Sequence, residues 1–285
     1  MKPKIPLLLL FIGLITFIFS CQQSQKVNTD VYTTALKLSD KIIDVYLTID
    51  KINENTYYRQ SLASILTDSG KTIAFKPILR NKNDIEIIMA YKDYLSDVYS
   101  KITNNENISD ATVKADVKAL LTLVDSLHPN VYSRKIEKIS ALISNPNIKF
   151  DILTYYVVDL LSDILYSDVK KWVSSVDSAY NVYAYKLDRI PISVFDMQKL
   201  QKYIYEPYKG NKKLVEIYKQ NLKQEAMIYK NKFKDKATGA YIAMKDFKEL
   251  LLELHNANPD MSFVYYKLAK IKAYTNKKVI RNDEK

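Results

Sequence analysis

The sequence predicts an all-α protein, a multi-helix bundle of about nine helices with no significant sheet. After residue 20 the chain holds only three glycines, Gly70, Gly210 and Gly239. A β-sandwich or barrel of this length needs many tight turns with positive φ, which glycine favours. Apolar residues recur at three- and four-residue steps, and no segment has a convincing strand pattern. Both observations favour helices throughout.

The helical patterns follow one another along the chain, each between a polar start and a helix-breaking stop. An apolar stripe begins at Val31, with Thr29 or Asp30 as the N-cap. Asp84 caps a later helix, and another ends before Pro129. The patterns cover residues 30–49, 57–67, 84–103, 110–128, 131–144, 151–187, 194–205, 212–234, 240–255 and 262–274.

The gaps between these patterns contain residues that break helices. Residues 68–83, which include Pro77, are expected to form a loop. Thr238-Gly239 is expected to end one helix and begin the next. The longest uninterrupted apolar pattern, over 151–187, contains no such break.

Charge divides the chain into two parts. Residues 22–195 hold 21 Lys and Arg against 21 Asp and Glu, whereas residues 196–285 hold 20 against 11. We therefore expect a neutral helical bundle over 30–190 and a basic, tyrosine-rich helical region over 191–285. The basic region is expected to pack on the same domain.

The N-terminus has the layout of a removable export signal. Lys2 and Lys4 precede an apolar run over residues 5–19, and Ser20 precedes Cys21, the only cysteine of the chain. The run is shorter than the about 20 apolar residues that a membrane-spanning helix needs. Plain secretion and a retained anchor remain as alternatives to lipidation.

Residues 18–21, Ile-Phe-Ser-Cys, resemble the lipobox of bacterial lipoproteins, in the relaxed form of spirochaete and Bacteroidetes-type sequences. Phe19 is bulkier than the usual pattern. The resemblance implies that residues 1–20 are a signal peptide, that Cys21 carries lipid, and that 21–29 form a lipidated cysteine and polar tether. It also implies an extracytoplasmic location on the bacterial envelope. Gln22 stands where enteric-type lipoproteins kept at the inner membrane have Asp, which favours the outer membrane.

Catalytic motifs are missing from the sequence. Three glycines cannot make either common phosphate-binding loop, and no cysteine other than Cys21 can act as a nucleophile. His128 and His255 lie near expected helix ends, where they complement the helix dipole. We therefore expect no enzymatic activity, no cofactor and no metal.

One pair of carboxylates is a candidate for a hydrolase or a metal site. Asp159 and Asp163 lie one turn apart on the expected helix over 151–187. Lys170 and Lys171 offer them salt-bridge partners, so a solvated, ion-paired face is the favoured interpretation.

The basic region interleaves lysines with tyrosines, a combination that suits recognition of an anionic partner. Lysine outnumbers arginine, and an exported protein rarely meets nucleic acid, so nucleic acid is not an expected partner. A plain solvated face and a compositional excess of tyrosine remain as alternatives. The candidate binding surface consists of Lys199, Lys202, Tyr203, Tyr205, Tyr208, Lys209, Lys212, Lys213, Tyr218 and Lys219.

The expected function is that of a membrane-anchored binding or adhesion module for an anionic envelope or host macromolecule. Candidate partners are an anionic polymer, lipid headgroups, or an envelope or host protein. The alternative is a periplasmic structural or assembly factor that binds one envelope protein. In general character the chain resembles the helical surface lipoproteins of spirochaetes and Bacteroidetes-type bacteria.

Overall fold

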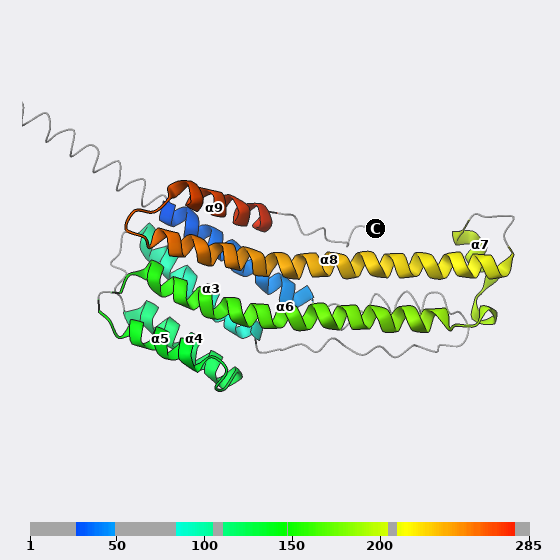
Figure 1. Ribbon diagram of the computed structural model, residues 1–285, viewed down its shortest axis with the longest axis horizontal. Coiled ribbons are helices and arrows are strands. Elements are labelled where there is room, and N and C mark those ends of the chain that lie inside the picture. Colours follow the sequence, from blue (N-terminus) through cyan, green and yellow to red (C-terminus); the bar gives the residue numbers. More distant parts are fainter. Residues whose placement is uncertain (1–26, 49–83, 105–110, 147, 205–209, 277–285) are drawn as a thin grey trace, which may run out of the picture. The chain divides into compact units, whose positions relative to one another are not determined.

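The computed structural model describes residues 27–48, 84–104, 111–146, 148–204 and 210–276 (Figure 1). All regular structure in these ranges is helical, with no strand, which confirms the predicted all-α class. Residues 1–26, with the expected signal and Cys21, lie outside the described ranges, as do the expected helix over 57–67 and the loop over 68–83.

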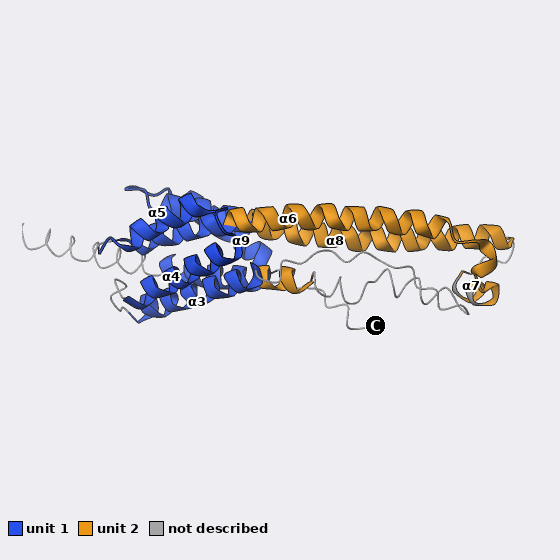
Figure 2. Ribbon diagram, turned by 90° about the horizontal axis from the view of Figure 1, so that it is seen from below, with its two compact units in different colours: residues 1–41, 83–161, 243–285 blue, residues 42–82, 162–242 orange. Residues whose placement is uncertain are grey.

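The chain divides into two compact units (Figure 2). Unit 1 comprises residues 1–41, 83–161 and 243–285, and unit 2 comprises 42–82 and 162–242. Two long helices, α6 (Phe150–Asp188) and α8 (Asn211–Leu254), contribute residues to both. The expected boundary near residue 190 follows charge, whereas these units follow packing, and that boundary stays a prediction.

Unit 1 contains α3 (Asp84–Thr103), α4 (Ala111–Leu127), α5 (Ser133–Ile143) and α9 (Met261–Thr275), with parts of α6, α8 and the helix over 27–48. A buried hydroxyl network joins three of these segments. Thr154 Oγ1 on α6 lies 3.1 Å from Tyr32 Oη and 2.7 Å from Tyr94 Oη on α3. Burial raises the pKa of both tyrosines, so both hydroxyls stay protonated and act as neutral hydrogen-bonding groups.

The first turn of α3 is fixed by a side-chain hydrogen bond between Asp84 and His128. His128, just after α4, places Nε2 2.6 Å from Asp84 Oδ1, and the Asp84 side chain is fully buried. His128 was expected to complement a helix dipole, and its partner in the structure is this carboxylate. Asn130 follows with φ of 65°, a left-handed conformation that asparagine tolerates, and turns the chain into α5. His255 is exposed, at the end of α8.

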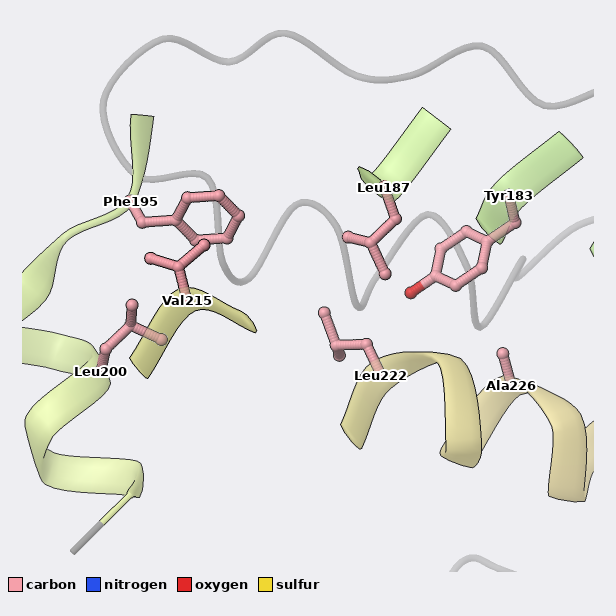
Figure 3. Close-up of a cluster of buried hydrophobic side chains, with 7 residues drawn as sticks. All are labelled: Tyr183, Leu187, Phe195, Leu200, Val215, Leu222 and Ala226. Atoms are coloured by element: carbon pink, nitrogen blue, oxygen red, sulfur yellow. The ribbon is translucent and has the colours of Figure 1, made fainter. Parts of the chain in front are cut away.

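Unit 2 is built on α6 and α8, which lie side by side and antiparallel (Figures 1 and 2). Between them the chain makes a 3-10 turn, η1 (Ile192–Val194), and the short helix α7 (Met197–Tyr203). One apolar cluster joins all of these segments (Figure 3). Its members are Tyr183, Leu187, Phe195, Leu200, Val215, Leu222 and Ala226.

The end of the helix over 27–48 also packs into unit 2. Tyr46 donates its hydroxyl proton to Asp168 Oδ2 at 2.7 Å, and its ring meets Trp172 edge-on at 4.7 Å. Asp168 and both aromatic residues are buried. A buried carboxylate needs such a donor, so this contact fixes where the helix lies along α6.

Most expected helices are confirmed within two residues, but the break at Thr238-Gly239 is wrong because α8 runs through it. Glycine inside a helix costs only about 1 kcal/mol relative to alanine. Buried Ala237 and Ala240 flank the site, and their packing maintains the helix. Lys236 adds an ion pair with Asp44 at 2.8 Å.

Two expected helix starts are also corrected. The chain is already helical at residue 27. Residues 27–29 are therefore not part of the tether, and neither Thr29 nor Asp30 is the N-cap. The buried side chain of Val27 stabilises this first turn by packing. The helix expected over 194–205 begins only at Met197. Phe195 is extended, and Asp196 Oδ1 accepts the amide of Gln198 at 3.0 Å to start α7.

Replacing His128 by alanine should lower the free energy of unfolding by about 2 kcal/mol, because it removes a hydrogen-bond partner of the fully buried Asp84 side chain. Urea unfolding measures the change. His255→Ala is the matched control, since His255 is exposed, and it should change stability by less than about 0.5 kcal/mol. Equal stability of the two variants would contradict the structural assignment of the Asp84–His128 pair.

Asp116 on α4 makes unit 1 sensitive to pH. Burial, a hydrogen bond with Asp97 on α3 and the charges of Asp97 and Asp93 raise its pKa to about 6, against the opposing charge of Lys101. The folded state therefore favours the protonated form of the Asp116 side chain. The stabilisation is fully present below about pH 4, the unfolded value, and is lost as pH rises through about 6.

Asp116→Asn should therefore stabilise the protein at pH 7.5, by about 1 kcal/mol once solvent screening is allowed for, and should have no such effect at pH 4. Thermal unfolding across pH measures this difference. Asp125→Asn, at an exposed position of the same helix, is the control and should show no pH-dependent gain. If the difference in stability between Asp116→Asn and the native chain were the same at every pH, the proposed link between Asp116 protonation and stability would be refuted.

Candidate functional site

The structure separates the ten predicted surface residues into four groups. Tyr205, Tyr208 and Lys209 lie outside the described ranges. Lys199 and Tyr203 belong to α7. Lys202 on α7 is exposed, as are Lys212 and Lys213 at the start of α8, whereas Tyr218 and Lys219 make contacts inside unit 2.

Lys219 is part of the folded framework. Its Nζ donates to the backbone carbonyl of Ile190 at 2.7 Å and to that of Asp188 at 3.1 Å. These carbonyls follow the end of α6, where the helix leaves acceptors unpaired. Burial lowers the pKa of the Lys219 ammonium, although the Asp188 carboxylate opposes this.

Tyr218 packs against the apolar cluster of unit 2. Its ring meets Phe195 edge-on at 6.4 Å, and Lys219 Nζ lies 5.5 Å from the same Phe195 ring. Together the two residues hold the segment after α6 against α8. An anionic partner would have to displace these contacts to use them.

Further along α8, lysines pair with aspartates of α6. Asp188 holds Lys223 at 2.5 Å, and Asp177 holds Lys234 at 2.9 Å and Lys230 at 3.4 Å. The hydrogen bond from Lys234 is the main reason that the pKa of Asp177 is lowered. These lysines give α8 its basic sequence, and the structure uses them internally.

Asp159, the carboxylate considered for hydrolysis, is bound in the same way within unit 1. Lys135 on α5 lies 2.6 Å from its Oδ2, and Lys248 on α8 pairs with its Oδ1. Burial opposes ionisation, but hydrogen bonds from these lysines lower the pKa of Asp159. Its described partners are thus Lys135 and Lys248, not the expected Lys170 and Lys171. Asp163 is exposed.

A group of exposed cations remains at one end of unit 2. We call Arg189, Lys202, Lys212 and Lys213 the tip cluster. All four are exposed, and none forms an ion pair with a residue that the structure describes. Figures 1 and 2 both show α7 beside the end of α6 and the start of α8, the three segments that carry them.

The tip cluster is electrostatically unusual for a helix start. The first turn of α8 holds Lys212 and Lys213 and no acidic residue, although the positive end of the helix dipole favours acids. Among the described acids nearby, Asp188 is paired with Lys223, Asp196 caps α7, and Glu216 is exposed. Positive charge therefore predominates at this surface.

Sequence reasoning missed two residues of this surface. Arg189 places its guanidinium carbon 4.1 Å from the centre of the Tyr185 ring, and Tyr185 is 55% exposed. They stand four residues apart at the end of α6, a spacing that puts both on one face. The four-residue spacing of Tyr185 and Arg189 could have indicated this pair from the sequence. Both residues, however, precede the basic region over 191–285.

Among the described residues, no helix is long and apolar enough to cross a membrane. The same part of the chain contains no group of three or more His, Cys, Asp or Glu side chains placed to hold a metal ion.

Comparison with known proteins adds no family to this geometry. No protein-family model, no curated protein and no solved structure matches the chain.

Proposed function

We propose that the protein is a lipid-anchored, extracytoplasmic binding module that holds an anionic surface or polymer through the tip cluster, without enzymatic activity. One observation supports this most. Lysines 219, 223, 230 and 234 of the basic region make contacts inside the fold, yet four cations at one end of unit 2 remain exposed.

The chemistry of these cations favours binding by charge density. Three of the four are lysines, whose ammonium groups are point charges without the planar fork that reads a specific carboxylate or phosphate pair. Such binding is diffuse and is screened by salt. It suits a repeating anionic partner rather than one small ligand.

The anchor is proposed from residues 18–21 and the single cysteine. Helix is already present at residue 27, so at most about 20 Å of extended chain separates Cys21 from the folded region. A lipid on Cys21 would thus keep the folded region close to a membrane surface.

Replacing Cys21 by serine should abolish incorporation of a fatty-acid label and release the protein from the membrane fraction, because the thiol is the proposed attachment atom. Mass spectrometry of the N-terminal peptide provides the measurement. Ser20→Ala, which keeps a small residue before the cysteine, is the control and should stay lipidated. A labelled Cys21→Ser protein would contradict the anchor.

Charge removal at the tip tests the binding surface. The change is Arg189, Lys202, Lys212 and Lys213 to glutamine in the chain from residue 21, with Cys21→Ser for solubility. Affinity for heparin, a soluble polyanion, should fall about ten-fold or more, and the affinity of the native sequence should fall steeply with added salt. Surface plasmon resonance measures both.

The matched control neutralises four other exposed lysines, Lys37, Lys118, Lys149 and Lys170, and makes the same change in net charge. It should retain heparin affinity within about three-fold. Equal loss in both variants would show that only net charge matters, against a tip site. Salt-resistant capture of one stoichiometric envelope protein would favour the assembly-factor alternative.

A further inference from the structure

We infer that the partner of the tip cluster is the surface of an anionic lipid bilayer, with Ile192 and Tyr185 entering the headgroup region beside the four cations. This inference rests on the proposed function, since it uses the same cations. It adds the class of partner and two apolar residues that touch it.

Exposed apolar side chains accompany the cations. Ile192 is 39% exposed in η1, and Val182 and Tyr185, 44% and 55% exposed, share the face of α6 that ends at Arg189. A hydrated polyanion offers these side chains no apolar environment. A bilayer offers both phosphates for the cations and an apolar boundary for the side chains.

The turn that carries Ile192 has much of its backbone already paired. Val194 donates its amide to Pro191 at 3.2 Å and Phe195 donates to Ile192 at 3.1 Å. Lys219 binds the carbonyls of Asp188 and Ile190. Backbone groups without partners are costly at low polarity, so this pairing lets the turn approach the headgroup boundary.

The apolar cluster of unit 2 also anchors this turn. Phe195 is buried in the apolar cluster beside Leu200 and Val215 (Figure 3). Ile192, three residues earlier, therefore stands on an ordered support rather than on a loose loop. An ordered support loses little conformational freedom on binding.

Tyr185 and Arg189 form a pair suited to an interface. Tyrosine combines an apolar ring with a hydroxyl that remains hydrated, and it is enriched where membranes meet water. The guanidinium over its ring can contact lipid phosphate while the ring lies against the acyl boundary. Among the described residues, Glu216 is an exposed acid that weakens this attraction, whereas Asp188 is paired with Lys223.

The test uses the chain from residue 21 with Cys21→Ser, so that no lipid contributes. Sedimentation is measured with vesicles of phosphatidylcholine alone and with vesicles that contain phosphatidylglycerol, and heparin is the soluble polyanion. We expect binding to phosphatidylglycerol vesicles and heparin but not to neutral vesicles. Each cation near an anionic surface contributes about five-fold to binding.

The double change Val182→Ser and Ile192→Ser should lower partition into phosphatidylglycerol vesicles about ten-fold and leave heparin affinity unchanged, because neither side chain contacts a cation of the tip cluster. Unchanged heparin affinity also shows that the tip remains folded. The matched control, Ile228→Ser with Val131→Ser, removes an exposed isoleucine and an exposed valine elsewhere and should bind vesicles like the native sequence.

A second variant reports insertion directly. Ile192→Trp should shift its fluorescence to shorter wavelength on phosphatidylglycerol vesicles and not on heparin, while buried Trp172 supplies a constant background. Vesicle binding unaffected by the double change, or no shift for Ile192→Trp, would overturn insertion but leave the proposed function standing. Binding to neither vesicles nor heparin would overturn both.

Discussion

Aspartates along α6 set the register of the helices that pack against it. Apolar packing holds helices together without fixing how far one slides along another, whereas an ion pair or a buried hydrogen bond does. Asp168 is the buried case and takes the hydroxyl proton of Tyr46. Each half-exposed pair contributes about 1 kcal/mol or less, so their effect is on register more than on stability. The half-exposed contacts are Asp159 with Lys135 and Lys248, Asp177 with Lys230 and Lys234, and Asp188 with Lys223.

This arrangement changes the meaning of the basic C-terminal third. In the sequence its lysines form one long positive segment, but the acids that bind many of them stand earlier in the chain, on α6. Lys219 differs from these lysines, because its ammonium group donates hydrogen bonds to two backbone carbonyls. Among the described residues of this third, the charge left for a partner is therefore smaller than composition indicates. Lys232 is exposed elsewhere on α8, but Lys202, Lys212 and Lys213 gather with Arg189 at one end of unit 2. This grouping is why we propose that a partner binds at this end rather than along a uniformly basic face.

Local signals predicted much of the fold. Asp84 and the apolar periodicity of residues 151–187 and 262–274 place α3, α6 and α9 within two residues of their observed bounds. The break at Thr238-Gly239 failed because packing of buried neighbours outweighs a modest local cost. The site was harder to predict. Lys213 and Lys219 are alike in sequence, and only the fold brings the carbonyls near Asp188 to one of them. The partner of Asp84, His128, likewise lies 44 residues away.

The central claim is that lysines of α7 and α8 divide into two groups. One group is bound inside the fold, and the other is open to a partner. Reaction of the native protein with a limiting amount of an amine-acylating reagent, read by peptide mass spectrometry, tests this directly. The account predicts that Lys202, Lys212 and Lys213 react fast, and that Lys223, Lys230 and Lys234, held by Asp188 and Asp177, react several-fold more slowly until the protein is unfolded. Equal reactivity of the two groups in the native protein would contradict it.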